Sequence, residues 1–204
     1  MKKIMTILTI GFFLLQGFKT GTGELTKEER KAGADYLKET RDYFTAHVKG
    51  LSDAQLDFKA APDKWSIRQC MEHIALAETF IFTVTENSLK QPANPEKKAE
   101  IKFTEDQLKV MLLDRSKKGQ APEPIQPKGK FNTAGEAVDV FLTNRNKLID
   151  YIETTKDDLR SHITPHPFFG MLDGYEWVIL LGAHSKRHTL QIEEVMASPD
   201  FPKK

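Results

Sequence analysis

The sequence predicts an all-α protein, a four-helix bundle with a long crossover connection and one extra short helix. Four long segments carry apolar residues at helical spacing, and each opens with a capping residue followed three positions later by Glu or Gln. No strand pattern of useful length appears, and no internal repeat is visible. Because the links between the segments are both short and long, at least one link must connect distant ends of the bundle.

The first 23 residues have the pattern of a secretory signal peptide. Residues 1–3 form a basic start with two lysines. The apolar run that follows at residues 4–18 is shorter than the roughly 20 residues of a stable membrane span. We expect cleavage within residues 19–23; an uncleaved segment would instead anchor the chain in the membrane. The sequence thus predicts an exported protein, periplasmic or extracellular, with a single domain at residues 24–204.

Composition narrows the class of partner. The 204 residues include 30 Lys and Arg against 29 Asp and Glu, for a formal net charge of +1. The lysines never cluster on one helical face with interleaved aromatic residues, so no nucleic-acid partner is predicted. A single cysteine, Cys70, excludes an intrachain disulfide. We interpret Cys70 as a small buried hydrophobic residue rather than part of a site.

The first helix is predicted at residues 27–49, where Thr26 and Glu29 have the spacing of a capping box. A short polar segment follows at residues 52–64, and Pro62 forbids a continuous helix there. This segment is interpreted as a link.

The second helix begins at Ser66, whose capping partner is Gln69, and runs to about residue 89. Its apolar stripe covers roughly half of the circumference, which indicates a helix packed on more than one side. His73 lies on the flank of this stripe, so we expect it to face inward.

The middle of the chain contains little regular structure. Residues 90–104 form a polar link, and residues 105–116 predict a short helix capped by Thr104 and Gln107. Residues 117–132 contain three prolines and two glycines, which exclude a regular helix or strand. Since this stretch is long for a turn, we interpret it as the crossover.

The third long helix runs from its cap, Thr133 with Glu136, to about residue 155. A linker at residues 156–172 follows and holds two histidines, His162 and His166, beside prolines and phenylalanines. These histidines could line a pocket mouth, but a solvated loop is the preferred interpretation.

The fourth helix, at residues 174–196, is capped by Asp173 with Glu176. Its first half is apolar almost all round, so it should be the most buried of the four. His184 and His188 are one helical turn apart and share the inward face. The outward face carries charged residues: Lys186, Arg187, Glu193 and Glu194.

A buried imidazole without a partner costs about 1–3 kcal/mol. A metal ion shared by His184 and His188 would satisfy both rings, whereas separate hydrogen bonds in the core are the alternative. The inward His73 on another helix favours the metal, because three neutral imidazoles with an open fourth position are typical of catalytic zinc and also suit nickel or iron.

The motifs of other metal and haem sites are absent from the sequence. Ser185 stands where the HExxH signature of zinc proteases has its glutamate, and no glutamate has histidine three residues on, as di-iron bundles require. One cysteine cannot supply the CxxCH attachment of c-type haem.

Two segments, residues 64–78 around His73 and residues 176–192 around His184 and His188, resemble the DinB/YfiT-like superfamily. The resemblance covers about residues 25–196. It implies a four-helix bundle in which His73, His184 and His188 hold a divalent metal ion. Relatives include thiol-dependent S-transferases, a thiol-dependent isomerase and a stress-induced group, and they are often homodimers. The thiols that the transferases use are largely cytosolic, which weakens that activity for an exported chain.

We therefore predict a metal-dependent enzyme, a hydrolase or group transferase, that acts on a small molecule and binds Zn, Ni or Fe. The alternative is a non-catalytic metal- or ligand-binding bundle of the cell envelope, with a stress-related role. A metal-free interaction module is a third hypothesis.

Several further side chains are weighed against plain packing roles. Gln191 could support the site by a hydrogen bond to an imidazole, with a helix-packing contact as the alternative. His47, Trp65 and Trp177 are interpreted as core or rim residues. No residue can be named as the general base.

Overall fold

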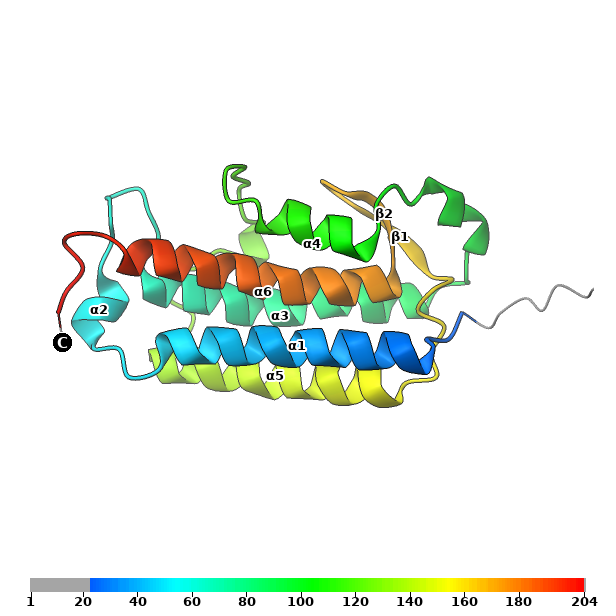
Figure 1. The fold of residues 1–204 in the computed structure, drawn as a ribbon, viewed down its shortest axis with the longest axis horizontal. Helices are drawn as coiled ribbons and strands as arrows, with labels where there is room; N and C mark the ends of the chain where they lie inside the picture. The colour runs from blue at the N-terminus through cyan, green and yellow to red at the C-terminus, as the bar shows by residue number, and fades with distance from the viewer. Residues whose placement is uncertain (1–22, 204) are drawn as a thin grey trace, which may run out of the picture.

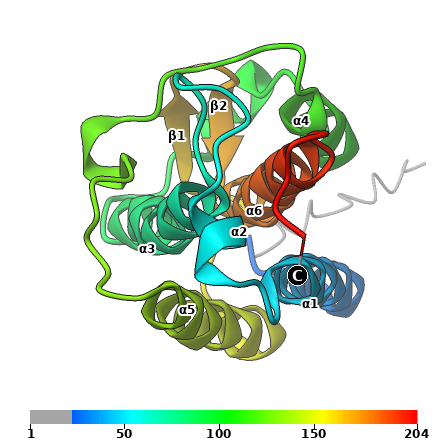
Figure 2. The ribbon, with the colours of Figure 1, turned by 90° about the vertical axis from the view of Figure 1, so that its left-hand side faces the viewer.

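The computed structural model describes residues 23–203, and its main feature is a bundle of four long helices (Figure 1). These are α1 (Lys27–Val48), α3 (Ile67–Leu89), α5 (Ala134–Thr154) and α6 (Gly174–Met196). Viewed end-on, they occupy the corners of a square in the order α3, α6, α1, α5 (Figure 2). Helices α1 and α6 run in one direction, and α3 and α5 run in the other. The all-α prediction is confirmed.

The predicted helix starts follow from local capping. Complete capping boxes form at four predicted positions: Thr26, Ser66, Thr104 and Asp173. At the start of α5 only half of the box forms. Thr133 accepts from the amide of Glu136, but the Glu136 carboxylate accepts from the amide of Asn132 instead of the cap residue.

The links contain short elements that the sequence did not predict. They are α2 (Asp53–Asp57) and two 3-10 helices, η1 (Pro95–Glu100) and η2 (Glu123–Ile125). Helix α2 has its own capping box between Ser52 and Gln55. One or two turns of helix are too short to show an apolar period, which explains why the pattern missed all three.

The expectation of no strand was wrong in the last linker. Strands β1 (Ile163–His166) and β2 (Gly170–Asp173) form an antiparallel hairpin in which His166 pairs with Gly170. Gly170 has φ of 76°, a conformation that favours glycine. Four-residue strands are too short for polar and apolar residues to alternate recognisably. The hairpin leads directly into α6 (Figure 1).

The connection from α3 to α5, residues 90–133, returns the chain from one end of the bundle to the other (Figure 1). The sequence predicted a crossover at residues 117–132; the whole connection serves as one, and we call residues 90–133 the crossover. The crossover contains η1, then α4 (Glu105–Leu113), then η2. Helix α4 packs against α6 on the outside of the bundle (Figure 2). It ends at Leu113, three residues earlier than predicted, because the backbone leaves the helical conformation at Asp114.

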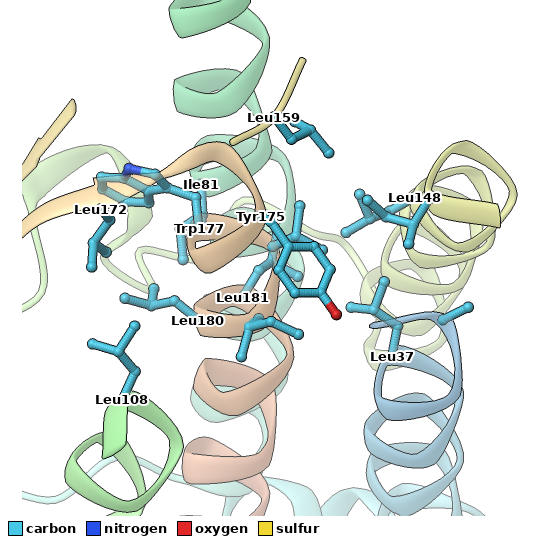
Figure 3. Close-up of a cluster of buried hydrophobic side chains, with 14 of the residues drawn as sticks. Leu37, Ile81, Leu108, Leu148, Leu159, Leu172, Tyr175, Trp177, Leu180 and Leu181 are labelled. Carbon is cyan, nitrogen blue, oxygen red and sulfur yellow. The ribbon is translucent and has the colours of Figure 1, made fainter. Parts of the chain in front are cut away.

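The first half of α6 is the best buried part of the long helices, because every residue from Gly174 to Ala183 is buried. Figure 3 shows Trp177, Leu180 and Leu181 of α6 amid leucines from three other helices, α1, α4 and α5. Gly182 allows the Tyr36 ring to lie close, since a Cβ at that position would stand 3.0 Å from Cε1 of Tyr36. This packing fixes α6, and with it the two histidines that follow.

A buried ion pair lies in the centre of the bundle. Arg145 of α5 is fully buried, and its Nε and Nη2 donate to the Glu78 carboxylate of α3 at 2.5 and 2.8 Å. The same guanidinium donates to Thr40 Oγ1 of α1 and to Ser185 Oγ of α6. It thus joins all four long helices, one residue away from His184.

The predicted signal peptide, residues 1–23, lies outside the described residues except for Gly23. None of the helices formed by residues 23–203 combines the length and apolar character that a membrane crossing requires.

Candidate metal centre

Three histidines from two helices converge at one point. His73 Nε2 of α3 lies 3.2 Å from His184 Nε2 and 3.1 Å from His188 Nε2, both of α6. One ligand atom from each ring lies within 4.8 Å of the others. We call these three residues the candidate metal centre.

Hydrogen bonds at the opposite ring nitrogens set the tautomers of two of these histidines. His73 Nδ1 lies 2.7 Å from the carbonyl oxygen of Ile125, which can only accept, so Nδ1 carries the hydrogen. His188 Nδ1 donates in the same way to Gln191 Oε1 at 2.9 Å. In the neutral rings both Nε2 atoms are therefore unprotonated, and two lone pairs face each other without a hydrogen between them.

This arrangement fits a metal ion. Zinc–nitrogen bonds of about 2.0–2.1 Å place ligand nitrogens about 3.3 Å apart in a tetrahedron and about 2.9 Å apart in an octahedron. The distances of 3.1 and 3.2 Å to His73 Nε2 lie between these values. Neutral imidazoles suit zinc, nickel and iron alike, so the three residues could hold a divalent metal ion without selecting one.

The electrostatics keep the three rings neutral. Burial lowers the pKa of His73, although the hydrogen bond to Ile125 opposes this. Burial also lowers the pKa of His184 and of His188 well below the ordinary value, and the neighbouring imidazoles add to the effect. Since a metal ion binds the neutral imidazole, the site is ready to bind at pH 7.

The crossover is fixed to α3 beside His73. The buried Glu72 carboxylate accepts backbone hydrogen bonds from Lys128, Gly129 and Lys130 at 2.9, 3.0 and 2.8 Å. Gly129 has φ of 78°, which favours glycine. Glu72 and His73 thus hold the segment that supplies the Ile125 carbonyl. Sequence reasoning missed Glu72, whose only signal was its place next to an inward histidine.

The crossover is also fixed to α6, through Arg187. The prediction that Arg187 faces outward to solvent was wrong. Its guanidinium donates to the carbonyl oxygens of Leu112 and Asp114 at 2.6 and 2.7 Å, and to that of Lys117. The last carbonyls of a helix have no partner within the helix, and Arg187 satisfies those at the end of α4.

Gln191 makes the imidazole contact, the first of its two predicted roles. Its Oε1 accepts from His188 Nδ1 and also from Arg115 Nη1 of the crossover at 3.3 Å. Arg115 in turn makes two hydrogen bonds of 2.8 Å to the Glu194 carboxylate. Two donors on one oxygen fix the side-chain amide, so the orientation of His188 depends on the crossover as well.

The two tryptophans have different roles. Trp177 is buried, and its Nε1 donates to Thr164 Oγ1 of the hairpin, in agreement with a packing role. Trp65 is only partly buried, and its ring centroid lies 4.9 Å from that of His73 and 6.0 Å from that of His188. Trp65 therefore covers the candidate metal centre instead of only filling the core.

The remaining candidates lie outside the candidate metal centre. Cys70 is buried, and burial raises the pKa of its thiol to about 12, which fits a small hydrophobic residue. His47 bridges the Tyr43 carbonyl and Glu193 at the rim. His162 bridges two carbonyls, those of Asp158 and Gln91, and His166 lies in the hairpin.

Fold and site together define the class of this protein: a four-helix bundle with three histidines that could hold a divalent metal ion. The chain belongs to the DinB superfamily, whose family model matches residues 36–192, as the resemblance of the two histidine segments implied.

Two individual proteins are similar to this chain. YuaE of Bacillus subtilis, an uncharacterized protein, is 29% identical over 148 residues, which cover 72% of this chain and 87% of YuaE. The solved structure of YfiT from Bacillus subtilis has a TM-score of 0.57 and 16% sequence identity, covering 84% of this chain and 88% of that one. YfiT is described as a probable metal-dependent hydrolase with an unusual four-helix bundle topology. At this identity the likeness shows the shared fold.

Proposed function

We propose that this protein is a metal-dependent enzyme whose single divalent ion is held by His73, His184 and His188. One observation carries the proposal: the unprotonated Nε2 atoms of His73 and His188 face each other at 3.1 Å, in tautomers set by Ile125 and Gln191. Two acceptors so close repel each other unless a cation lies between them. Gln191 and the Ile125 carbonyl orient the ligand rings.

The proposed reaction is hydrolysis of a small molecule, with group transfer as the other outcome. A divalent ion bound there would supply Lewis acidity, which lowers the pKa of water toward about 7 and polarises a carbonyl or phosphoryl group. Trp65 covers one side of the centre, with its ring centroid 4.9 Å from that of His73 and 6.0 Å from that of His188. The description of YfiT as a probable metal-dependent hydrolase supports hydrolysis over transfer.

A non-catalytic metal-binding bundle is the second candidate. It is favoured by the bond from His73 to the crossover, through which a bound ion would also stabilise the fold. A screen of esters, amides and electrophilic thiol acceptors, with and without metal, separates the two. Turnover that a chelator abolishes supports the enzyme, whereas no turnover with a large fall in melting temperature on chelation supports the structural role.

The metal content tests the proposal. We expect about one equivalent of zinc, nickel or iron in protein purified without a His-tag, and less than about a tenth of that in His184→Ala. His47→Ala is the matched control, because His47 is a partly buried histidine outside the centre. Wild-type metal content in His184→Ala would refute the proposal.

We further propose that the protein is exported and that its signal peptide is removed by cleavage within residues 19–23. The basic start and the short apolar run support this. The mass of the protein from the cell envelope or medium should correspond to a chain beginning within residues 20–24. A homodimer stays a prediction from the family, which light scattering on the purified protein can test.

A further inference from the structure

The hairpin places a fourth histidine at one end of the histidine face of α6. The ring of His166, the last residue of β1, lies 5.0 Å from the ring of Trp177 and 4.8 Å from that of Phe169. Trp177 precedes His184 by seven residues, or two helical turns, on the same face of α6. Trp177, against which His166 packs, therefore lies about 10 Å along the helix from His184.

The backbone of the hairpin sets the tautomer of His166. The amides of Phe168 and Phe169 donate to its Nδ1 at 3.1 and 3.3 Å, so the neutral ring carries its hydrogen on Nε2. This tautomer is the opposite of that in His73 and His188. Burial lowers the pKa of His166 to about 4, so the ring is neutral at pH 7. Among residues 23–203 no acceptor bonds its Nε2–H.

The hairpin tip lies beside α6 and close to the crossover. From the start of α6 the hairpin folds back in the direction of the helix, so its tip lies alongside α6 and not beyond its end (Figure 1). A Cβ at Gly119 of the crossover would stand 3.8 Å from Phe168 Cζ. His166 is separate from the three converging rings, because its ring packs against those of Phe169 and Trp177 and not against those of the centre.

We propose that His166 is a substrate-positioning residue, whose Nε2–H donates to an oxygen acceptor of a small molecule bound at the His73, His184 and His188 centre. The proposal rests on the proposed function. The substrate would therefore have two functional groups. One binds at the centre, and the other is a carbonyl, carboxylate or phosphoryl group whose oxygen accepts a hydrogen bond from His166.

Two variants separate the donor from the structural role of the ring. In His166→Asn, the side-chain oxygen can take the place of Nδ1 and accept from the amides of Phe168 and Phe169, but no donor replaces the Nε2–H. In His166→Gln, the side-chain N–H can lie near the Nε2 position, but the acceptor for the two amides is lost. His162→Asn is the control, because the ring nitrogens of His162 contact only the backbone carbonyls of Asp158 and Gln91.

The experiment uses full-length protein loaded with Co²⁺, whose visible spectrum reports ligands that bind at the centre. The probes are succinate, glutarate and adipate, each compared with the monocarboxylate of the same chain length. At the best length, we expect wild type, His166→Gln and His162→Asn to prefer the dicarboxylate by about ten-fold or more. His166→Asn should bind one equivalent of Co²⁺ but lose this preference.

The outcomes distinguish the two proposals. A preference that His166→Asn retains, or one that wild type lacks at every length, would overturn the role of His166 while leaving the metal centre intact. Wild-type protein that binds no Co²⁺ would overturn the proposed function, and the role of His166 with it.

Discussion

Replacing Glu72 by glutamine tests how the crossover is held beside the candidate metal centre. The buried carboxylate accepts three backbone hydrogen bonds, two on Oε1 from Lys128 and Lys130, and one on Oε2 from Gly129. The glutamine side chain has nearly the same shape and can keep its oxygen toward Lys128 and Lys130. Its NH₂ group then faces the Gly129 amide, so one donor is left without an acceptor.

The magnitude follows from that one bond. A hydrogen bond to a charged group contributes about 1.5–3 kcal/mol, so Glu72→Gln should lower the free energy of unfolding by about 2 kcal/mol. Because the same segment supplies the Ile125 carbonyl to His73, the affinity for metal should fall about ten-fold, the lower end for groups that orient a ligand imidazole.

Urea unfolding followed by circular dichroism measures the stability, and competition with a chelator dye measures the metal affinity. Glu123→Gln is the matched control, since Glu123 lies in the crossover but forms an exposed pair with Lys128 Nζ. We expect no measurable change in that variant. If Glu72→Gln stays within about 0.5 kcal/mol of wild type, the crossover is not fixed by Glu72 as inferred.

Three further predictions concern contacts away from the three imidazoles. Arg145→Met should destabilise the fold by about 3–5 kcal/mol in thermal unfolding, because it leaves Glu78 charged and buried alone; Arg145→Met with Glu78→Met should recover most of that loss. Arg187→Met should expose residues 114–121 to limited proteolysis, because the carbonyls of Leu112, Asp114 and Lys117 lose their donor. A cleavage rate equal to that of wild type would contradict the inference that Arg187 fixes the crossover to α6. The pKa of Glu176 is raised by burial to about 8, above its unfolded value of 4.5, so its contribution to stability is full below pH 4.5 and is lost as the pH rises through 8. Urea midpoints at pH 5 and pH 8 should therefore differ less in Glu176→Gln than in wild type, and an unchanged difference would contradict this assignment.

Most of the fold could be predicted because its signals are local. Thr26, Ser66 and Asp173 each cap a helix with a partner three residues on, and the apolar stripes show which faces are buried. The hairpin could not be predicted, since four-residue strands show no clear alternation and their pairing depends on the turn at Gly170.

The site was predictable only in part, for a related reason. His184 and His188 share a helical face, and the apolar stripe turns His73 inward, so the sequence could indicate three inward histidines. What orients them comes from the crossover, whose docking has no sequence period. The Ile125 carbonyl is a backbone group that no pattern marks, and Arg187 looked like an ordinary solvated residue.

The same limit applies to His166. Its position in a Pro-rich linker suggested a solvated loop, whereas the tautomer depends on amides that only the hairpin turn brings to Nδ1. Tertiary contacts of irregular segments thus decide which histidines can bind a metal and which can donate a hydrogen bond.

Anomalous scattering from a crystal of the zinc-loaded protein tests the central claim most directly. We predict a single strong peak about 2.0–2.1 Å from the Nε2 atoms of His73, His184 and His188. Zinc found only elsewhere in the crystal, or no peak between these three rings, would contradict the account.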